Sequence, residues 1–321
     1  MSLKGIKDKF FSVGYEGKRK VITIFGIKIK YKEVPDKLIV KFIGGLGNQM
    51  FQYGFGKSLE KITRKKVLFY KHHPEYYQRF IVNENGENAK GAMVRQYALD
   101  IFDLNITFAT DRQYKSCEMK FNVGNNPFDF NPELFKKQKS ALYIGYFQNE
   151  KYLNPVRKQL EKDLTFPKIK KDDTFNQNWL KKIRSCENPV FIHIRKGDYV
   201  NLGWDLSMEY YTKAIKYIKE HVENPTFFVF GQKCSDFIKN EFISDIPFEI
   251  IGETNSDNKE DWKDIVLMEE CKHAIIANST FSWWAAWLGK ANNGIVTAPS
   301  PFLFKRDEII CSHWVKIKWQ Q

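Results

Sequence analysis

The segment from His193 to Asp198 is the strongest candidate for chemistry, because it places charged side chains at the end of a predicted buried strand. Alternation along the strand puts His193 and Arg195 on one side and Ile194 on the other. The guanidinium of Arg195 is a rigid fork that fits the oxygens of a phosphate. This pattern favours anion binding by Arg195 over the alternative, a buried ion pair between Arg195 and Asp198.

A glycine-rich turn precedes a predicted helix near the start of the chain. Gly45 and Gly47 would let the backbone approach a ligand closely, and Asn48 and Gln49 would lie at the first turn of the helix. The spacing is neither G-x-G-x-x-G nor a P-loop. A donor-binding turn and a purely structural tight turn both fit this pattern.

A third polar segment opens a predicted helix rich in tryptophan. The hydroxyls of Ser279 and Thr280, the amide of Asn278 and the free N–H groups of the helix start are able to hold a phosphate. Capping of the helix by the same residues is the simpler interpretation on local evidence. The tryptophans that follow, Trp283, Trp284 and Trp287, are typical of core or of an acceptor platform.

Strands and helices are predicted to alternate, which indicates an α/β fold with parallel, doubly wound sheets. In such sheets ligands bind at the carboxyl ends of the strands, where the three segments fall. Residues 72–140 show no clear pattern, and a long helix is predicted after Tyr152. The predicted strands are 38–43, 67–70, 142–147, 189–194, 226–230, 248–251, 273–277 and 295–298, and the predicted helices are 48–62, 207–222, 236–242, 260–271 and 279–288.

Composition narrows the class of protein. The 321 residues suit two domains, and the five scattered cysteines indicate a reducing compartment. No apolar run reaches the ~18 residues of a membrane span, and no signal peptide is evident.

Of the net charge of +13, residues 1–37 carry +6, from ten basic and four acidic residues. A nucleic-acid partner is not indicated, since no basic segment has the patterns of such proteins. The basic arm is predicted to be a short hairpin, a poorly ordered segment or a membrane-surface contact.

The sequence contains no D-x-D triplet, the usual carboxylate arrangement for a metal that holds a nucleotide sugar. We therefore expect no metal and no cofactor. A leaving diphosphate would then depend on cationic side chains and helix termini.

Four motifs in combination resemble glycosyltransferase family 11, which contains the α-1,2-fucosyltransferases, and the resemblance runs from Leu38 to Pro301. They are Gly44–Tyr53 (GGLGNQMFQY), Gly145–Tyr152 (GYFQNEKY), His193–Tyr199 (HIRKGDY) and Cys271–Leu288 (CKHAIIANSTFSWWAAWL). The resemblance implies two Rossmann-like domains facing a cleft, the GT-B arrangement. Residues 1–37 would form a basic arm, 38–155 the acceptor side and 156–321 the GDP-fucose-binding domain.

The resemblance also implies an activity. Fucose would pass from GDP-fucose to a sugar hydroxyl, O-2 of a galactose in a glycan, with inversion and without a metal. A related transferase with another linkage or nucleotide sugar, and an inactive glycan-binding protein, are the alternatives. Residues 1–37 resemble leaders of bacterial polysaccharide-assembly enzymes, so we expect action in the cytoplasm, with peripheral contact at the inner face of a bacterial membrane.

Within this resemblance, Arg195 is expected to contact the pyrophosphate, helped by Ser279 and Thr280. His193, Arg195 and Asp198 form the expected catalytic set, and Asp198 and Glu150 are the candidates for a general base. Family members usually carry Arg-Arg where this chain has Arg195 and Lys196, a tolerable change if Lys196 points elsewhere. The loop 231–236 lacks the acidic pair of many members, so its guanosine contacts are not carried over. The expected donor-binding set is Gly45, Gly47, Asn48, Gln49, Arg195, Asn278, Ser279 and Thr280.

Overall fold

The computed structural model describes residues 11–16, 19–32, 37–71, 96–117, 119–122, 127–136, 139–231, 248–252 and 260–320. The strands are β1 (Phe11–Glu16), β2 (Arg19–Ile24), β3 (Ile27–Lys32), β4 (Leu38–Lys41), β5 (Val67–Tyr70), β6 (Lys120–Asn122), β7 (Ala141–Ile144), β8 (Asn188–His193), β9 (Pro225–Phe230), β10 (Phe248–Gly252), β11 (His273–Ile275), β12 (Val296–Ser300) and β13 (Val315–Lys318). The α-helices are α2 (Leu46–Thr63), α3 (Asp111–Lys115), α4 (Arg157–Asp163), α5 (Thr174–Ser185), α6 (Asp198–Asn201), α7 (Met208–His221), α10 (Trp262–Glu269) and α11 (Thr280–Leu288). Short 3₁₀ helices cover Leu99–Ile101, Pro132–Phe135, Glu150–Tyr152, Asn154–Val156 and Lys290–Asn293.

The C-terminal sheet is parallel throughout and has the order β10-β9-β8-β11-β12-β13. Counted from β8, the chain builds outward to β10 and then returns to add β11, β12 and β13 on the other side. The strand order therefore reverses between β8 and β11, and a ligand is expected at the carboxyl ends of these two strands.

The N-terminal sheet repeats this principle with the order β5-β4-β7-β6, again with parallel pairs. Its reversal lies between β4 and β7. The Gln52 side chain bridges this point, because its amide contacts the N–H and the carbonyl of Ile43 after β4 and the carbonyl of Gly145 after β7. The expectation of an α/β fold with two parallel sheets is confirmed.

One apolar core runs from the N-terminal sheet into the C-terminal sheet. Helix α11 supplies much of it, because Trp283, Trp284 and Trp287 are at most 1% exposed. The ring of Phe51 on α2 lies 4.6 Å from that of Trp283 and 4.9 Å from that of Trp284. The three tryptophans are therefore core residues that join the two sheets.

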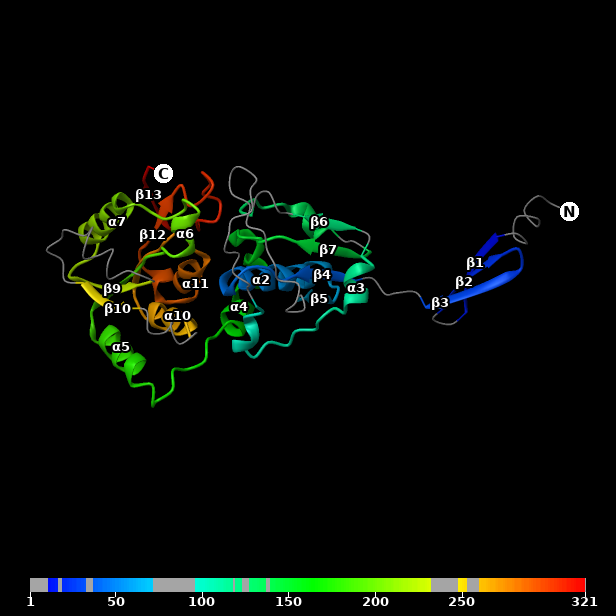
Figure 1. Ribbon diagram of the computed structural model, residues 1–321, viewed down its shortest axis with the longest axis horizontal. Coiled ribbons are helices and arrows are strands. Elements are labelled where there is room, and N and C mark those ends of the chain that lie inside the picture. The colour runs from blue at the N-terminus through cyan, green and yellow to red at the C-terminus, as the bar shows by residue number, and fades with distance from the viewer. Residues whose placement is uncertain are drawn as a thin grey trace.

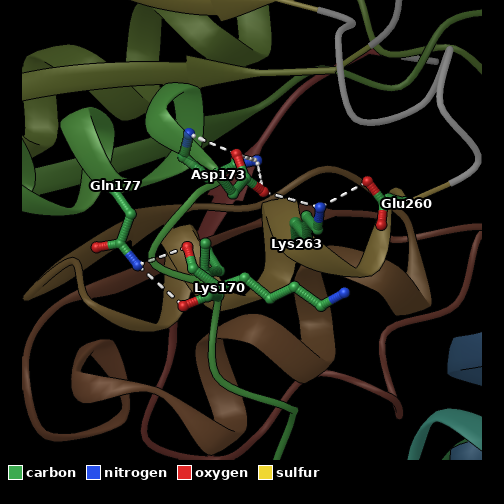
Figure 2. Close-up of polar contacts among 7 residues, drawn as sticks. Lys170, Asp173, Gln177, Glu260 and Lys263 are labelled. Atoms are coloured by element: carbon green, nitrogen blue, oxygen red, sulfur yellow. Dashed lines mark hydrogen bonds and ion pairs between the residues drawn. The ribbon is translucent and has the colours of Figure 1, made fainter.

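The polypeptide crosses between the two sheets after α4. Helix α4 still packs on α2, since Tyr53 donates to Asp163 at 2.8 Å. Beyond it, Asp173 caps α5 and accepts a hydrogen bond from Lys263 of α10 at 2.8 Å (Figure 2). Burial opposes ionisation of Asp173, but hydrogen bonds from Lys263 and Asn176 outweigh it and lower its pKa. This polar cluster fixes the connecting segment to the C-terminal sheet.

Several element bounds differ from the sequence prediction. The long helix expected after Tyr152 is replaced by two 3₁₀ turns and the seven-residue α4. Pro155 explains the break, since proline cannot donate within a helix. Helices α5 and α6 and strand β13 were not predicted. The predicted helix 236–242 lies outside the described residues.

The N-terminal arm contains a separate antiparallel sheet of order β1-β2-β3 (Figure 1). A hairpin was one of the alternatives left open by the sequence. None of the helices in the described part of the chain is long and apolar enough to cross a membrane.

Candidate active site

The end of β8 is held by α7. The hydroxyl of Tyr211 donates to the carbonyl of His193 at 3.2 Å and receives a backbone hydrogen bond from Arg195. The N–H of Ile194 donates to Phe230 at the end of β9 at 2.9 Å. Gly197 then turns the chain into α6 with a φ of 55°, a left-handed value that favours glycine. The backbone that presents Arg195 is thus fixed on both sides.

The Arg195 guanidinium is partly buried and lies over an aromatic ring. Its Cζ atom is 5.1 Å from the ring centre of Tyr199. The Tyr199 hydroxyl donates to the carbonyl of Asn278 at 3.4 Å, and the Asn278 amide donates to the carbonyl of Trp204 at 2.7 Å. The structure therefore brings the segment after β8, which carries Arg195, and the segment that opens α11, which carries Asn278, together at the reversal point of the C-terminal sheet.

The other charged residues of this segment point in different directions. Lys196 forms an ion pair with Asp205 at 2.8 Å. Its side chain is therefore engaged outside the expected diphosphate contact, which was the condition for tolerating lysine where family members usually carry arginine. Asp198 is the first residue of α6, and its side chain lies outside those that the structure describes. The alternative interpretation of this segment, an ion pair between Arg195 and Asp198, therefore falls outside the described side chains.

His193 is buried and neutral. Burial, and then the nearby charge of Arg195, lower its pKa to about 3. At neutral pH the imidazole is therefore uncharged, able to form a hydrogen bond but a poor proton acceptor. Its Nδ1 atom and the Oδ1 atom of Asn278 are buried without a hydrogen-bond partner among the described atoms. Such atoms are rare in folded proteins and fit a place where a polar ligand arrives.

The start of α11 faces the N-terminal sheet. Ser279 caps the helix by accepting from the N–H of Phe281 at 3.3 Å, as in the simpler interpretation. Thr280 donates to Asn48 at 3.2 Å, and Gln148 donates to the same Asn48 oxygen at 2.7 Å. These hydrogen bonds tie the reversal points of the two sheets to each other.

The glycine-rich turn takes part in the same junction. A Cβ on Gly47 would lie 2.7 Å from the Thr280 hydroxyl and 2.9 Å from the Thr280 backbone carbon. The Gly47 carbonyl also accepts from the indole of Trp284 at 2.8 Å. By contrast, no atom lies within 4 Å of a Cβ built on Gly45, the residue before α2. Close contact between the first turn of α2 and the first turn of α11 thus explains the need for glycine at position 47.

The Gln49 side chain, expected in the donor-binding set, is hydrogen-bonded to backbone groups of the protein itself. Its amide donates to the carbonyls of Gly44 and Gln96 and accepts from the N–H of Ala98, with distances of 2.8, 2.8 and 2.9 Å. Its side chain therefore fixes the segment 96–98 against the glycine-rich turn.

Glu150, a candidate base, is also engaged. It accepts from the indole of Trp287 at 3.1 Å and forms an ion pair with Arg157 at 3.2 Å. These contacts favour the structural role that the sequence left open for this carboxylate.

An aromatic line that the sequence did not single out extends from Arg195. The ring of Tyr199 lies 5.7 Å from that of Trp204, which lies 5.2 Å from that of Phe304. Phe304 is 50% exposed and has a φ of 52°, unusual for a bulky residue. Glycine and asparagine are the usual sequence signals of a positive φ, and the turn around Phe304 contains neither. The position of Phe304 therefore follows only from the tertiary structure.

Two cavities among the described residues lie away from this site. Both adjoin Leu288 at the end of α11, and their volumes are about 680 and 590 Å³. Neither is lined by Arg195, His193 or Asn278. No group of three or more His, Cys, Asp or Glu side chains suited to a metal occurs among the residues described.

Comparison with known proteins gives the family. Residues 124–318 match the model of glycosyl transferase family 11. The chain belongs to glycosyl transferase family 11. The chain is 32% identical to an Escherichia coli α-1,2-colitosyltransferase, over 88% of this chain and 99% of that enzyme. It is 27% identical to galactoside α-(1,2)-fucosyltransferase 1 of Leontocebus fuscicollis, over 52% of this chain and 49% of that enzyme.

Among solved structures, NodZ α-1,6-fucosyltransferase soaked with GDP-fucose aligns with 80% of this chain and 93% of its own. The identity is 11% and the TM-score 0.45. NodZ comes from Bradyrhizobium. The family model and the E. coli relative confirm the resemblance to family 11, and three of the four motifs lie within the matched residues. The chain is a glycosyltransferase with two parallel α/β sheets.

Proposed function

We propose that this family 11 enzyme transfers L-fucose from GDP-β-L-fucose to a sugar hydroxyl, O-2 of a terminal galactose, with inversion. One observation carries the proposal: Arg195 lies at the reversal point of the C-terminal sheet, beside the buried unsatisfied atoms of His193 and Asn278. This is where an α/β sheet binds a nucleotide, and an arginine there suits a diphosphate. The galactoside fucosyltransferase relative supports the sugar and the linkage.

In this mechanism the acceptor oxygen forms a bond to the anomeric carbon as the bond from that carbon to the diphosphate oxygen breaks. GDP leaves with the electron pair, and its terminal phosphate gains negative charge. Arg195 stabilises that charge, and the Tyr199 ring holds the guanidinium in place. One such preorganised contact typically lowers the barrier by ~2.7–4 kcal/mol. The neutral imidazole of His193 can form a hydrogen bond to GDP-fucose through Nδ1, and the Oδ1 atom of Asn278 can accept one from a hydroxyl or N–H group of GDP-fucose.

The acceptor proton has fewer candidate recipients than the sequence allowed. Glu150 is tied to Trp287 and Arg157, and the low pKa of His193 makes it a poor base. Asp198 stays the candidate base, at the start of α6 and three residues beyond Arg195. A late proton transfer, after the bond to GDP has largely broken, would make few demands on its strength.

The decisive experiment incubates the protein with GDP-fucose and a panel of galactosides, followed by linkage analysis of the product. An α-1,2-linked fucosyl galactoside is the expected product. Tight binding of the galactosides without transfer or donor hydrolysis would instead favour the inactive glycan-binding alternative. A product with another linkage would retain the enzyme class and overturn the acceptor position.

A second donor is worth testing because the E. coli relative at 32% identity is named a colitosyltransferase. Colitose is L-fucose without the 3-hydroxyl. A site that hydrogen-bonds this hydroxyl rejects the deoxy sugar by about 10⁴-fold or more, whereas an apolar site discriminates weakly. The ratio of kcat/KM for GDP-fucose and GDP-colitose therefore identifies the natural donor.

We also propose that transfer needs no metal, since the sequence lacks a D-x-D triplet and offers a cationic segment at the diphosphate position. Activity with GDP-fucose is expected to persist after dialysis against excess chelator. Loss of activity in chelator, with rescue by added manganese or magnesium, would contradict this.

We propose that the enzyme acts in the cytoplasm, at the inner face of a bacterial membrane. The basic arm supports this location, because positively charged segments are drawn to anionic lipid.

A further inference from the structure

We propose that the β1–β3 sheet docks on an anionic lipid bilayer through an apolar face and inserts the tip of its β2–β3 hairpin. The face follows from the strand register. Val13 pairs with Ile22, Ile22 with Ile29, and Ile24 with Ile27. Directly paired residues share one side of a sheet, so these five side chains form a continuous apolar surface.

This surface is open to solvent. Val13 is 48% exposed, Ile24 38%, Ile27 69% and Ile29 51%. A soluble protein rarely presents so many large aliphatic side chains side by side, and such patches mark contact with a protein or a membrane.

The tip of the hairpin adds an independent observation. Phe25 and Gly26 form the two-residue turn between the paired residues Ile24 and Ile27, with φ values of 48° and 81°. Both values are positive, as in a type I′ turn, where Asn-Gly is the preferred sequence. A phenylalanine is strained there, and its ring is 73% exposed. A strained residue that contributes little burial indicates a function outside the fold.

Charge selects lipid over a second copy of the chain. Residues 1–37 carry a net charge of +6, and Lys28 is exposed next to the tip. Two copies stacked through this face would bring like charges together, whereas anionic headgroups would neutralise them. The most exposed apolar residues, Phe25 and Ile27, lie at the end of the hairpin. They would be at the margin of a stacked dimer but deepest in a bilayer.

The turn offers a variant that separates folding from docking. Phe25→Asn creates the preferred Asn-Gly turn, so the sheet should fold at least as well as before. Partition of the full-length protein onto vesicles of phosphatidylcholine and phosphatidylglycerol should nevertheless fall by about 10-fold or more. Phe304→Asn is the matched control, because Phe304 is also 50% exposed at a positive φ of 52° but lies beside the active site.

Co-sedimentation with vesicles, thermal melting and light scattering give the outcome. The proposal expects wild-type and Phe304→Asn proteins to bind the anionic vesicles alike, and the Phe25→Asn protein to bind weakly with an unchanged or higher Tm. Equal binding by all three, or equal binding to pure phosphatidylcholine, would overturn it. A wild-type dimer that Phe25→Asn separates would show that the face contacts a second copy instead. Vesicle binding is measured without substrate, so these outcomes are independent of the proposed transfer reaction.

Discussion

At the scale of residues, the site contains two adjacent cations with different surroundings. Lys196 is paired with Asp205 and turned to the carbonyl of Leu206, at 2.8 and 3.4 Å. Arg195 instead lies over Tyr199, near His193, whose Nδ1 atom is buried without a hydrogen-bond partner among the described atoms. Because the neutral imidazole adds no charge, the guanidinium is the cation best placed to meet a diphosphate there.

Replacement of Arg195 by alanine should lower kcat by ~100-fold or more and weaken GDP binding. Arg195→Lys should recover little, since an ammonium cannot reproduce the planar fork. Lys196→Ala is the matched control and should affect kcat far less, because this lysine is engaged by Asp205. Initial rates, together with melts with and without GDP, measure these effects.

A structural role for Arg195 gives a different result. If it only pairs with Asp198, then Arg195→Ala and Asp198→Ala should both lower Tm while activity per folded molecule survives. A folded Arg195→Ala protein with near-normal turnover would remove Arg195 from the mechanism.

At the scale of elements, the N-terminal ends of α2 and α11 meet. Gly47 of α2 touches Thr280 of α11, and Trp284 of α11 donates to the carbonyl of Gly47. Asn48 adds hydrogen bonds to Thr280 and Gln148. The segment that carries the donor-site candidates in the C-terminal sheet is therefore positioned by the first turn of α2.

Gly47→Ala should separate these two helix ends, because the new methyl would lie 2.9 Å from the backbone of Thr280. Overpacking of this kind costs about 1–3 kcal/mol, so Tm and transfer rate should both fall. Gly45→Ala is the control, two residues away, since a methyl there meets no atom within 4 Å. Equal effects of the two substitutions on Tm would contradict the close packing.

At the scale of the whole molecule, the two sheets share one apolar core, through α2 and α11. The far end of α11 is different, because it adjoins a cavity of about 590 Å³ that contains the carboxylates of Glu269 and Glu270. Glu270 is held by Arg184, which donates a hydrogen bond to it, and by Lys290. Burial, and then the charge of Glu270, raise the pKa of Glu269 to about 8.

The free energy of unfolding should therefore depend on the ionisation of Glu269 between about pH 4.5 and pH 8. The folded protein keeps its proton up to about pH 8, whereas the unfolded chain loses it near 4.5. The folded state binds more protons in this window, so its stability is highest below the unfolded pKa and falls as pH rises towards 8. The loss is on the order of a few kcal/mol.

Glu269→Gln should remove this dependence and raise Tm at alkaline pH, with little change in acid. Glu270→Gln should act in the opposite direction, since the hydrogen bond from Arg184, against some burial, lowers the pKa of Glu270 and favours its charged form. Thermal melts across the pH range measure both effects. A Glu269→Gln protein with the pH profile of the wild type would show that Glu269 is ionised when folded.

The sequence by itself determined the alternation of strands and helices, the family and the position of Arg195 at a strand end. These follow from local periodicity and from motifs that are contiguous in the chain. Only the tertiary structure decided that Trp283, Trp284 and Trp287 are core, that Gly47 and Thr280 meet, and that Trp204 and Phe304 extend from Tyr199. The reason is that these contacts join residues far apart in sequence, so neither partner's pattern contains the other. The strained turn at Phe25 shows the same limit, because its sequence resembles a strand until the backbone angles are known.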